Sequence, residues 1–323
     1  MEKNIQKHKF ILDLMEEDNM KKNIIVFVLF NFIFPSFSLC QQYPYLRDVQ
    51  IQATGSFNTN QKFYYYNYTI KNSNTSAGEI SKWEIDISKN PNTVDIDTIG
   101  LLFENDGFTE GCFRRHFPSI KDKIVPIGFP KTPGGSWSGT LTNRLTAAFG
   151  GIDTDHIHTG QSLSGFEMMS KGLPAIRRCI VSPYFDVIAL FPDPEDTTIH
   201  YYVPPVDSVR NAVKYYGWTV GPTAPPINFI ATVWCDTLTS YTTQSRTLGW
   251  IKDDATENKY LGYFASAKTK LVQRDSVGAR TVLLQVLKDV DSDSTANLNS
   301  EAYALICYNT KYLSAHFGFN GGR

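Results

Sequence analysis

The chain has 323 residues, with 31 Lys and Arg against 32 Asp and Glu, 42% hydrophobic residues and 20% charged residues. The length suggests two domains of ordinary size, and the apolar content is high enough to fill their cores, which excludes an intrinsically disordered chain. Because positive and negative charges balance, the protein has no overall basic field that would attract nucleic acid or anionic lipid. A general nucleic-acid binder is therefore not expected.

The strongest local signal is an export sequence at residues 20–40. A lysine pair at 21–22 precedes an apolar run that begins at Ile24, and a stretch that contains small residues ends at Cys40. This order is typical of a secretory signal peptide, which would be cleaved before Gln41. The run is shorter than the about 20 apolar residues that a membrane-spanning helix needs, so no transmembrane segment is expected in the mature chain.

Two further interpretations concern the ends of this signal. Residues 1–19 carry mixed charges and no hydrophobic pattern, so we interpret them as an extension upstream of the true start at Met20. A lipidated N-terminus at Cys40 is the alternative to cleavage, but a lipobox has a small residue before its cysteine, and Leu39 is large and branched. The mature protein is therefore expected to be secreted, periplasmic or attached to the cell surface.

Four cysteines remain after cleavage, namely Cys112, Cys179, Cys235 and Cys307. Thiols outside the cytoplasm tend to pair, and the division into domains described below favours one disulfide between Cys112 and Cys179 and another between Cys235 and Cys307. Four cysteines permit three pairings, and four buried free thiols are the alternative. Their spacing contains no CxxC element, which argues against a structural zinc site.

Residues 41–216 have the pattern of antiparallel β-strands. The segment 62–70 is rich in aromatic and β-branched residues, turn-forming residues follow at 72–78, and residues 83–87 alternate apolar with acidic side chains. Further strands are expected at 98–103, 145–149, 164–169, 176–181 and 185–190. No helical period of useful length occurs here, so we predict a β-sandwich of the immunoglobulin or fibronectin kind.

A segment rich in glycine and proline at 217–226 is predicted to be a linker between two domains. After it, the period of the apolar residues changes from two to about 3.6. Helices are expected at 228–247, 257–273, 276–289 and 299–315. Their apolar stripes would be buried in a small bundle over residues 227–323. The predicted fold is therefore α+β, with an N-terminal antiparallel β-sandwich followed by a C-terminal helical bundle.

The predicted helical region resembles the FIMAH-type helical domain of secreted and surface-attached bacterial proteins. The matching positions are Leu248-Gly249-Trp250-Ile251, Leu261, Ala265, Ala267, Lys268, Leu271, Ala279, Leu284, Ser300-Glu301-Ala302, Tyr308-Asn309 and Tyr312-Leu313. The bulky pair Tyr263-Phe264 departs from the pattern, and Cys235 and Cys307 are not part of it. Such domains accompany hydrolases and non-enzymatic proteins alike, so the resemblance implies attachment or interaction and no particular chemistry. Residues 160–174 are similar to an uncharacterised secreted β-domain.

The most metal-like pattern is the pair His156 and His158, because on a strand both side chains would point the same way and could share one ion. A third ligand would have to come from elsewhere, and a polar surface turn is the alternative. Residues 289–300 begin like a calcium loop, with carboxylates at alternate positions. Serine stands, however, where an EF-hand has its sixth-position glycine and its twelfth-position glutamate. No metal or other cofactor is assigned.

No catalytic residue is assigned either. Two near misses to the Gly-x-Ser-x-Gly nucleophile pattern, at 134–138 and 160–164, have serine in place of the second glycine. The carboxylates that could be combined into a glycosidase pair are Glu167, Asp186, Glu195 and Asp196. Two carboxyl groups can act as such a pair only at a suitable distance from each other, and the sequence does not give that distance. The chain is therefore expected to be non-catalytic.

Tyr64, Tyr66 and Tyr68 would share one face of a strand, with Phe63 and Tyr65 on the other. An exposed row of tyrosines could stack on sugar rings or dock a partner, whereas packing in the core or across strands is the alternative. The sequence favours an exported, non-catalytic interaction, adhesion or structural module with a protein or glycan partner at the cell surface. A secreted polysaccharide-binding module or glycoside hydrolase is the alternative.

Overall fold

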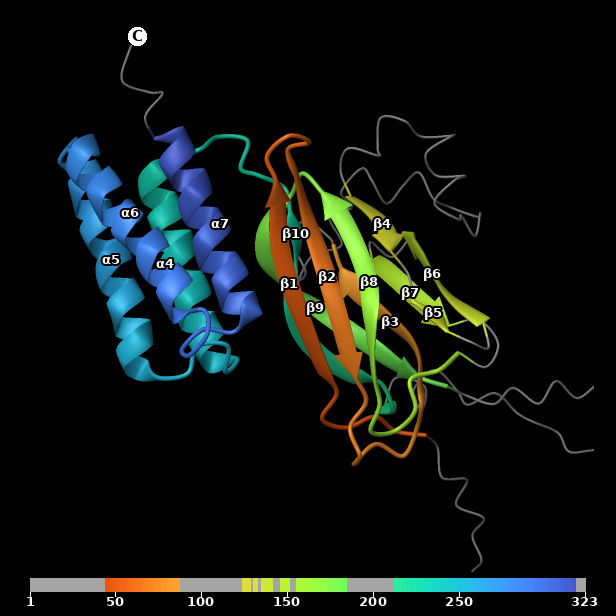
Figure 1. Ribbon diagram of the computed structural model, residues 1–323. Coiled ribbons are helices and arrows are strands. Elements are labelled where there is room, and N and C mark those ends of the chain that lie inside the picture. Colours follow the sequence, from red (N-terminus) through yellow and green to blue (C-terminus); the bar gives the residue numbers. More distant parts are fainter. Residues whose placement is uncertain are drawn as a thin grey trace, which may run out of the picture. The chain divides into compact units, whose positions relative to one another are not determined.

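The computed structural model describes residues 44–87, 124–128, 130–132, 135–141, 146–151, 155–184 and 212–317. Within these residues the chain forms ten strands and then four helices (Figure 1). The strands are β1 (Gln50–Asn58), β2 (Phe63–Lys71), β3 (Ile80–Asp86), β4 (Ile124–Gly128), β5 (Lys131–Thr132), β6 (Gly135–Leu141), β7 (Thr146–Gly151), β8 (Ser162–Ser170), β9 (Leu173–Pro183) and β10 (Tyr215–Thr223). The helices are α4 (Ala231–Thr247), α5 (Asp254–Val272), α6 (Ser276–Asp293) and α7 (Ser300–His316). The predicted α+β class is confirmed.

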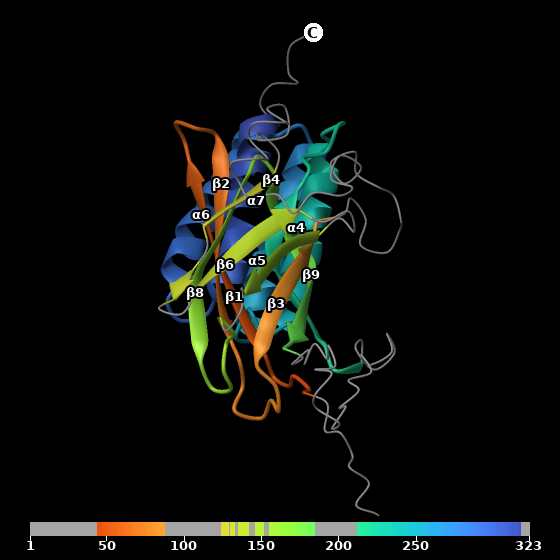
Figure 2. The same ribbon diagram turned by 90° about the vertical axis from the view of Figure 1, so that its right-hand side faces the viewer.

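Among the described residues, all strand pairs are antiparallel, and they build two sheets. One sheet has the order β1-β2-β8-β4 and the other the order β10-β9-β3-β7-β6-β5. The edge strands β1 and β10, one from each sheet, contact each other although they are far apart in the sequence. Figure 2, a view turned by 90°, shows strands of both sheets in front of the helices.

Aromatic side chains fill the space between the two sheets. Trp83 on β3 stacks on Phe149 of β7, with ring centroids 4.6 Å apart, and both rings meet the edge of Phe166 on β8. Tyr68 on β2 approaches Trp83 at 5.1 Å. The alternation seen in residues 83–87 explains this arrangement, because every second residue of a strand faces the same layer. Buried rings of this size dominate the energy of a core.

The four helices pack in the cyclic order α4, α5, α6, α7, since α4 also contacts α7. Three of them begin with a polar side chain that accepts a hydrogen bond from a backbone N–H of the first turn: Asp253 for α5, Asp275 for α6 and Asn299 for α7. All four predicted helices are confirmed, with α6 longer than expected. Among the described residues, none of the helices combines the length and the apolar content that crossing a bilayer demands.

Helix α7 joins the bundle to both sheets. The hydroxyl of Tyr308 donates to the carbonyl of Gly55 on β1 at 3.0 Å, and the side-chain amide of Asn309 donates to the carbonyl of Pro174 on β9 at 2.9 Å. Gly55 makes room for this close contact, because a Cβ atom there would lie 3.1 Å from the Cβ of Ala304. The described parts of residues 44–323 accordingly belong to one compact unit.

The expectation of a linker at 217–226 is wrong for most of that segment, because β10 extends through Thr223 and pairs with β9 along its length. Proline is tolerated here because β10 is an edge strand, which pairs with β9 on one side only. Pro222 has no N–H to donate, and on the unpaired side of an edge strand no donor is required. Gly221 is tightly placed: an added Cβ would lie 3.2 Å from Arg177 and 3.3 Å from Ile85. The strands expected at 98–103 and 185–190 lie outside the described residues.

The expected disulfide between Cys235 and Cys307 is also wrong. Both residues are buried free thiols, and so is Cys179, the expected partner of Cys112; Cys112 itself lies outside the described residues. Each of the three packs as a small apolar side chain in the core. Burial raises the pKa of Cys179 to about 12 and that of Cys235 to about 11, which keeps both thiols protonated and unreactive at neutral pH.

The thiol state can be checked with a thiol-specific chromogenic reagent. In native protein we expect Cys179, Cys235 and Cys307 to react slowly or not at all, because burial excludes the reagent and holds the thiolate fraction down. Unfolding in guanidinium without reductant should then expose at least these three thiols at once. Recovery of fewer than three would mean that a described cysteine forms a disulfide.

The contact of α7 with β1 can be checked by filling the gap at Gly55. We expect Gly55→Val to lower the free energy of unfolding by about 1–3 kcal/mol, because the new side chain overpacks the helix–strand contact. Gly150→Val on β7 is the matched control, since no atom lies within 4 Å of a Cβ added there. Chemical denaturation of both variants decides the matter: equal stability losses would contradict the close approach of α7 to β1.

Candidate functional site

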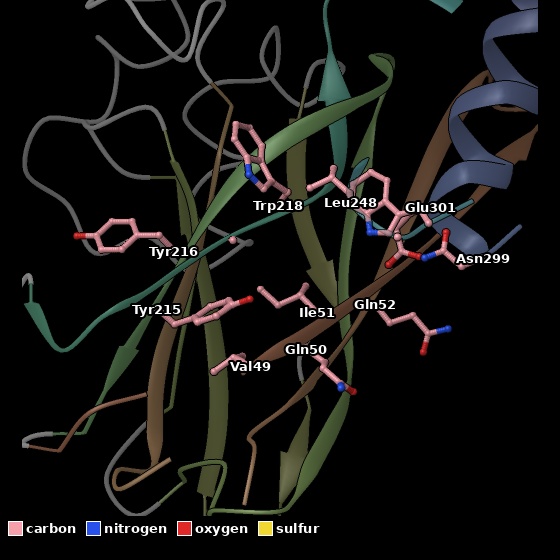
Figure 3. A pocket seen from close by; sticks show the side chains of 13 residues that line it. Val49, Gln50, Ile51, Gln52, Tyr215, Tyr216, Trp218, Leu248, Asn299 and Glu301 are labelled. Carbon is pink, nitrogen blue, oxygen red and sulfur yellow. The ribbon is translucent and has the colours of Figure 1, made fainter. Parts of the chain in front are cut away.

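A groove with a volume of about 610 Å³ lies beside the two edge strands (Figure 3). Its walls come from the first residues of β1 and β10, from the α4–α5 connection and from the start of α7. The lining residues are 49–52, 215–218, 248–250, Asn299 and Glu301. This is a concave surface where four segments that are distant in the sequence meet, which is the usual setting of a ligand site.

Two hydrogen bonds flank the β1 residues that line the groove. Before the strands begin, the backbone N–H of Leu46 donates to the carbonyl of Val213 at 3.2 Å. At the other end, the carboxylate of Glu301 accepts from the backbone N–H of Ala53 at 2.6 Å. Backbone groups of alternate strand residues point to the same edge, so the N–H and C=O of Ile51 face the groove just as Ala53 faces Glu301. The groove is thus a short open stretch of the seam between β1 and β10.

Glu301 is the only carboxylate among the described lining residues, and only 2% of it is exposed. Its second oxygen accepts from the hydroxyl of Ser300 at 3.0 Å. Burial raises the pKa of Glu301, and the hydrogen bonds from Ala53 and Ser300 oppose that rise. Both carboxylate oxygens already have hydrogen-bond partners within the protein. The role of Glu301 is therefore to hold α7 against β1.

Two large aromatic side chains stand open to solvent beside the groove. Tyr216 is 48% exposed and Trp218 is 45% exposed, and they lie two residues apart on one face of β10. They are the only largely exposed aromatic side chains among those whose exposure the structure describes. Figure 3 shows Tyr215 turned the other way, toward Ile51. An added Cβ on Gly217 would lie 2.8 Å from the Tyr215 ring, so glycine makes room for it.

The remaining polar lining is uncharged. Gln50 and Gln52 are exposed on one face of β1, and each side-chain amide offers donors and an acceptor. Asn299 caps α7, with its side-chain oxygen accepting from the N–H of Ala302. No Lys, Arg or His is found among the described residues that line the groove. The groups that the described lining leaves open to solvent are therefore aromatic rings and side-chain amides.

The predicted binding row of tyrosines is not exposed. Tyr66 and Tyr68 are fully buried, and their hydroxyls donate to the carbonyls of Gly172 at 2.8 Å and Val220 at 3.0 Å. Burial raises the pKa of both well above the usual value. Tyr64 is half-buried against Tyr308 of α7. The core-packing alternative is correct for Tyr66 and Tyr68, because the face they share is the one that meets the second sheet and the bundle.

His156 and His158 do point the same way, as predicted, but toward Glu79. The Nδ1 atoms of both rings lie at its carboxylate, with His156 at 3.3 Å, and the His156 ring stacks on Tyr184. In the described part of the chain, no group of three His, Cys, Asp or Glu side chains is placed to hold a metal ion. The contact of both rings with the Glu79 carboxylate explains why the two histidines point the same way.

The carboxylates of the calcium-like segment are each engaged by a tyrosine. The pairs are Tyr263 with Asp289 at 2.7 Å, Tyr303 with Asp291 at 2.9 Å and Tyr260 with Asp293 at 2.6 Å. Asp289, Asp291 and Asp293 all lie within α6 rather than in a loop. These contacts link α6 to its neighbours α5 and α7, so the alternate carboxylates serve the packing of the bundle.

The predicted glycosidase carboxylates are not brought to the groove. Glu167 lies on β8, where burial raises its pKa, and Asp186, Glu195 and Asp196 lie outside the described residues. Of the two serine near misses, residues 160–164 form a turn and the start of β8, with Gly160 at a positive φ of 80°. The other, at 134–138, lies partly outside the described residues and its remaining part belongs to β6.

Sequence reasoning missed both exposed aromatic residues: Tyr216 falls at the end of the predicted β-domain without a predicted strand, and Trp218 falls in the predicted linker at 217–226. A signal was present: Tyr215, Tyr216, Trp218, Thr219 and Val220 are all aromatic or β-branched, which is typical of a strand. This run predicts a strand if its aromatic and β-branched residues count for more than the nearby glycines and prolines. Because side chains alternate between the two faces of a strand, Tyr216 and Trp218 would then share one face.

The role of Glu301 can be checked by two substitutions. We expect Glu301→Ala to lower the free energy of unfolding by about 1–3 kcal/mol, because it leaves the buried N–H of Ala53 without an acceptor. Glu301→Gln keeps an acceptor without burying a charge, and we expect it to be at least as stable as the wild type at neutral pH.

The dependence on pH has a defined sign. Because burial raises the pKa of Glu301 in the folded protein, its contribution to stability is fully present below the unfolded pKa of about 4.3 and is lost as the pH rises through the folded value. The stability of wild type relative to Glu301→Gln should therefore fall as the pH rises above about 4. Urea denaturation at several pH values measures this; a difference that does not change with pH would show that the carboxylate is not desolvated.

Comparison with known proteins finds no family model, no curated protein and no solved structure that matches this chain. The chemistry of the groove is therefore the basis for the function proposed below.

Proposed function

We propose that this protein is an exported, non-catalytic interaction module that binds its partner in the groove beside β1 and β10. The observation that carries the proposal is the exposed pair Tyr216 and Trp218 at the rim of a concave surface. Large aromatic side chains held on a rigid strand lose little conformational entropy on binding and provide a large contact area, so they commonly dominate binding energies. Rows of exposed aromatic residues are unusual on a surface without a partner.

The non-catalytic part of the proposal is supported by the state of Glu301. General acid–base catalysis needs a group that can exchange a proton with a substrate, and both oxygens of this carboxylate accept hydrogen bonds from the protein itself. Glycoside cleavage needs two carboxyl groups, and the described lining provides one. The described lining also includes no serine, cysteine or histidine that would form a nucleophile–base pair.

Three finer interpretations belong to the same proposal. Residues 20–40 act as the signal peptide and bring the mature chain to the cell surface or the medium. The two antiparallel sheets form a sandwich of the immunoglobulin or fibronectin kind, which their face-to-face aromatic packing supports. The bundle of α4 to α7 is a FIMAH-type domain, in keeping with a role in attachment rather than in chemistry.

Binding to surfaces tests the proposal. Labelled protein is incubated with intact bacterial cells, purified cell-wall sacculi and mammalian cells, and the retained fraction is measured. We expect the wild type to be retained on at least one of these surfaces, and the double variant Tyr216→Ala/Trp218→Ala to lose at least nine tenths of that binding, because truncating aromatic anchors typically costs about 2 kcal/mol or more.

The matched control is Val277→Ala/Leu284→Ala, which removes two exposed apolar side chains from α6 and leaves the groove intact. The control should bind like the wild type. Equal binding by the groove variant, or no retention on any of the surfaces, would contradict the proposal. So would turnover of chromogenic glycosides, esters or peptides that disappears in the groove variant, because it would make the groove an active site.

A further inference from the structure

We infer that the start of α4 and the end of α5 form a docking surface for a membrane of anionic lipid. This surface is separate from the groove, so the inference goes beyond the proposed function. It is drawn from three properties of the helical bundle: a cluster of exposed aliphatic side chains, a separation of charge between the two ends of the bundle, and an exposed arginine beside the cluster.

Four aliphatic side chains are open to solvent where α4 starts and α5 ends. Ile227 is 93% exposed, Ile230 57%, Val233 54% and Val272 67%. Ile230 is the N-cap of α4, Val233 lies in the first turn of that helix, and Val272 is the last residue of α5. We call these four residues the α4–α5 patch. Exposed apolar side chains that gather in this way usually mark an interaction with a protein or a membrane.

An ion pair fixes how the members of the patch lie relative to one another. The Nζ atom of Lys268 on α5 contacts both carboxylate oxygens of Asp236 on α4, at 2.6 and 2.8 Å. A second ion pair joins the last turn of α4 to the first turn of α5, so the two helices are antiparallel (Figure 1). Val233, one turn before Asp236, therefore lies beside Val272, one turn after Lys268. Ile230 is three residues before Val233 and continues the same face.

The other exposed aliphatic side chains of the described helices lie on a different side of the bundle. Val277 and Leu284 are seven residues apart on α6, so they share one face of that helix, and the buried residues of α6 lie on the opposite face. Helix α6 is diagonal to α4 in the cyclic order of the bundle. These two residues therefore provide a matched control surface.

The two ends of the bundle carry opposite charge, which the balanced total of the chain hides. The half that holds the patch comprises residues 231–238, 265–284 and 309–317. Its basic and acidic residues are Lys268, Lys270, Arg274, Arg280 and Lys311 against Asp236 and Asp275. In the other half, residues 239–264 and 285–308, they are Arg246, Lys252, Lys259 and Lys288 against Asp253, Asp254, Glu257, Asp289, Asp291, Asp293 and Glu301. Apolar side chains among basic residues are typical of a surface that binds anionic lipid.

Arg274 provides a positive charge that no acidic side chain neutralises in the described part of the chain. The two lysines nearest the patch have acidic partners, Asp236 for Lys268 and Asp275 for Lys270. Arg274 lies two residues after Val272, in the turn between α5 and α6, where it is exposed. A guanidinium group there can bind a lipid phosphate while the aliphatic side chains enter the boundary between headgroups and acyl chains.

The same charge separation disfavours a second copy of the chain as the partner. A two-fold contact would bring the patches of both copies together, and with them the basic residues that surround each patch. A head-to-tail contact would place the patch against the acidic half of the bundle, which exposes no large aliphatic side chain within the described residues. An anionic bilayer offers both a negative surface and an apolar interior.

Sedimentation with lipid vesicles tests the inference. The chain from Gln41 onward holds every described residue and lacks the apolar run that begins at Ile24, which would itself bind lipid. We expect it to bind vesicles of phosphatidylcholine mixed with phosphatidylglycerol about tenfold or more tighter than phosphatidylcholine alone. Added salt should weaken this binding, because it screens the charges.

Two variants address the apolar and the charged part of the surface. Val233→Gln/Val272→Gln should weaken binding to the mixed vesicles about tenfold or more, because it removes the side chains that enter the lipid. Arg274→Asn should weaken it about fivefold, through the loss of one basic residue near the bilayer. Asparagine suits this position, because the backbone of Arg274 has a positive φ of 60°. All three side chains are exposed, so both variants should melt at the wild-type temperature.

The matched control is Val277→Gln/Leu284→Gln, which should bind the mixed vesicles like the wild type. So should Tyr216→Ala/Trp218→Ala, because the groove is a separate surface, and this separates the inference from the proposed function. An absence of vesicle binding, equal binding to both kinds of vesicle, or an equal loss in the control would overturn the inference. So would a dimer in sedimentation velocity, without lipid, that dissociates in Val233→Gln/Val272→Gln, because the patch would then bind a second copy.

Discussion

The seating of α7 against the open edge of β1 is the contact on which the rest of the structure depends. An edge strand presents unpaired N–H and C=O groups, and leaving them without partners is costly where water is excluded. Glu301 accepts from Ala53, and Tyr308 donates to Gly55, so one helix satisfies consecutive outward-facing residues of the strand. The price is a buried carboxylate, which is stable there because both oxygens accept hydrogen bonds and because it lies in the first turn of a helix, near the positive end of the helix dipole.

The groove is a consequence of where this helix starts. Helix α7 begins at Ser300, so its side chains reach β1 from Ala53 onward and leave the preceding residues of the strand uncovered. The seam between β1 and β10 therefore has a covered part, which belongs to the core, and an open part, which is the groove. Changes that shift α7 along the strand would alter the stability of the bundle and the shape of the groove together.

Much of the fold is local and could be predicted from the sequence. The four helices follow from the apolar period, and the strand that contains Tyr66 and Tyr68 follows from its aromatic and β-branched residues. What the period cannot indicate is which strand becomes an edge. Pro222 would break a central strand, but it is harmless at the edge of a sheet. The glycines and prolines of residues 217–226 therefore predict a linker where the structure has most of β10, including Trp218.

The contact between the helical bundle and the sheets could not be predicted from the sequence either, for a different reason. Gly55 and Ala304 meet although about 250 residues separate them in the sequence, and a small residue in a strand or a helix has many explanations when it is considered alone. The cysteines illustrate the same limit. Even numbers of thiols suggest disulfides, but whether Cys235 and Cys307 pair depends on tertiary geometry, and here both fill core positions of their helices.

The distribution of aromatic residues gives the groove its significance. The chain contains 17 Tyr, 21 Phe and 5 Trp, and those whose exposure is described are buried or half-buried with two exceptions. Burying a side chain of this size is worth about 1.5–3 kcal/mol, so leaving one exposed forgoes a large stabilisation. The two exceptions are Tyr216 and Trp218, which lie on the same face of one strand and line the same groove. Because they lie two residues apart on one strand, a single uncovered face exposes both rings, and that face is available to a partner.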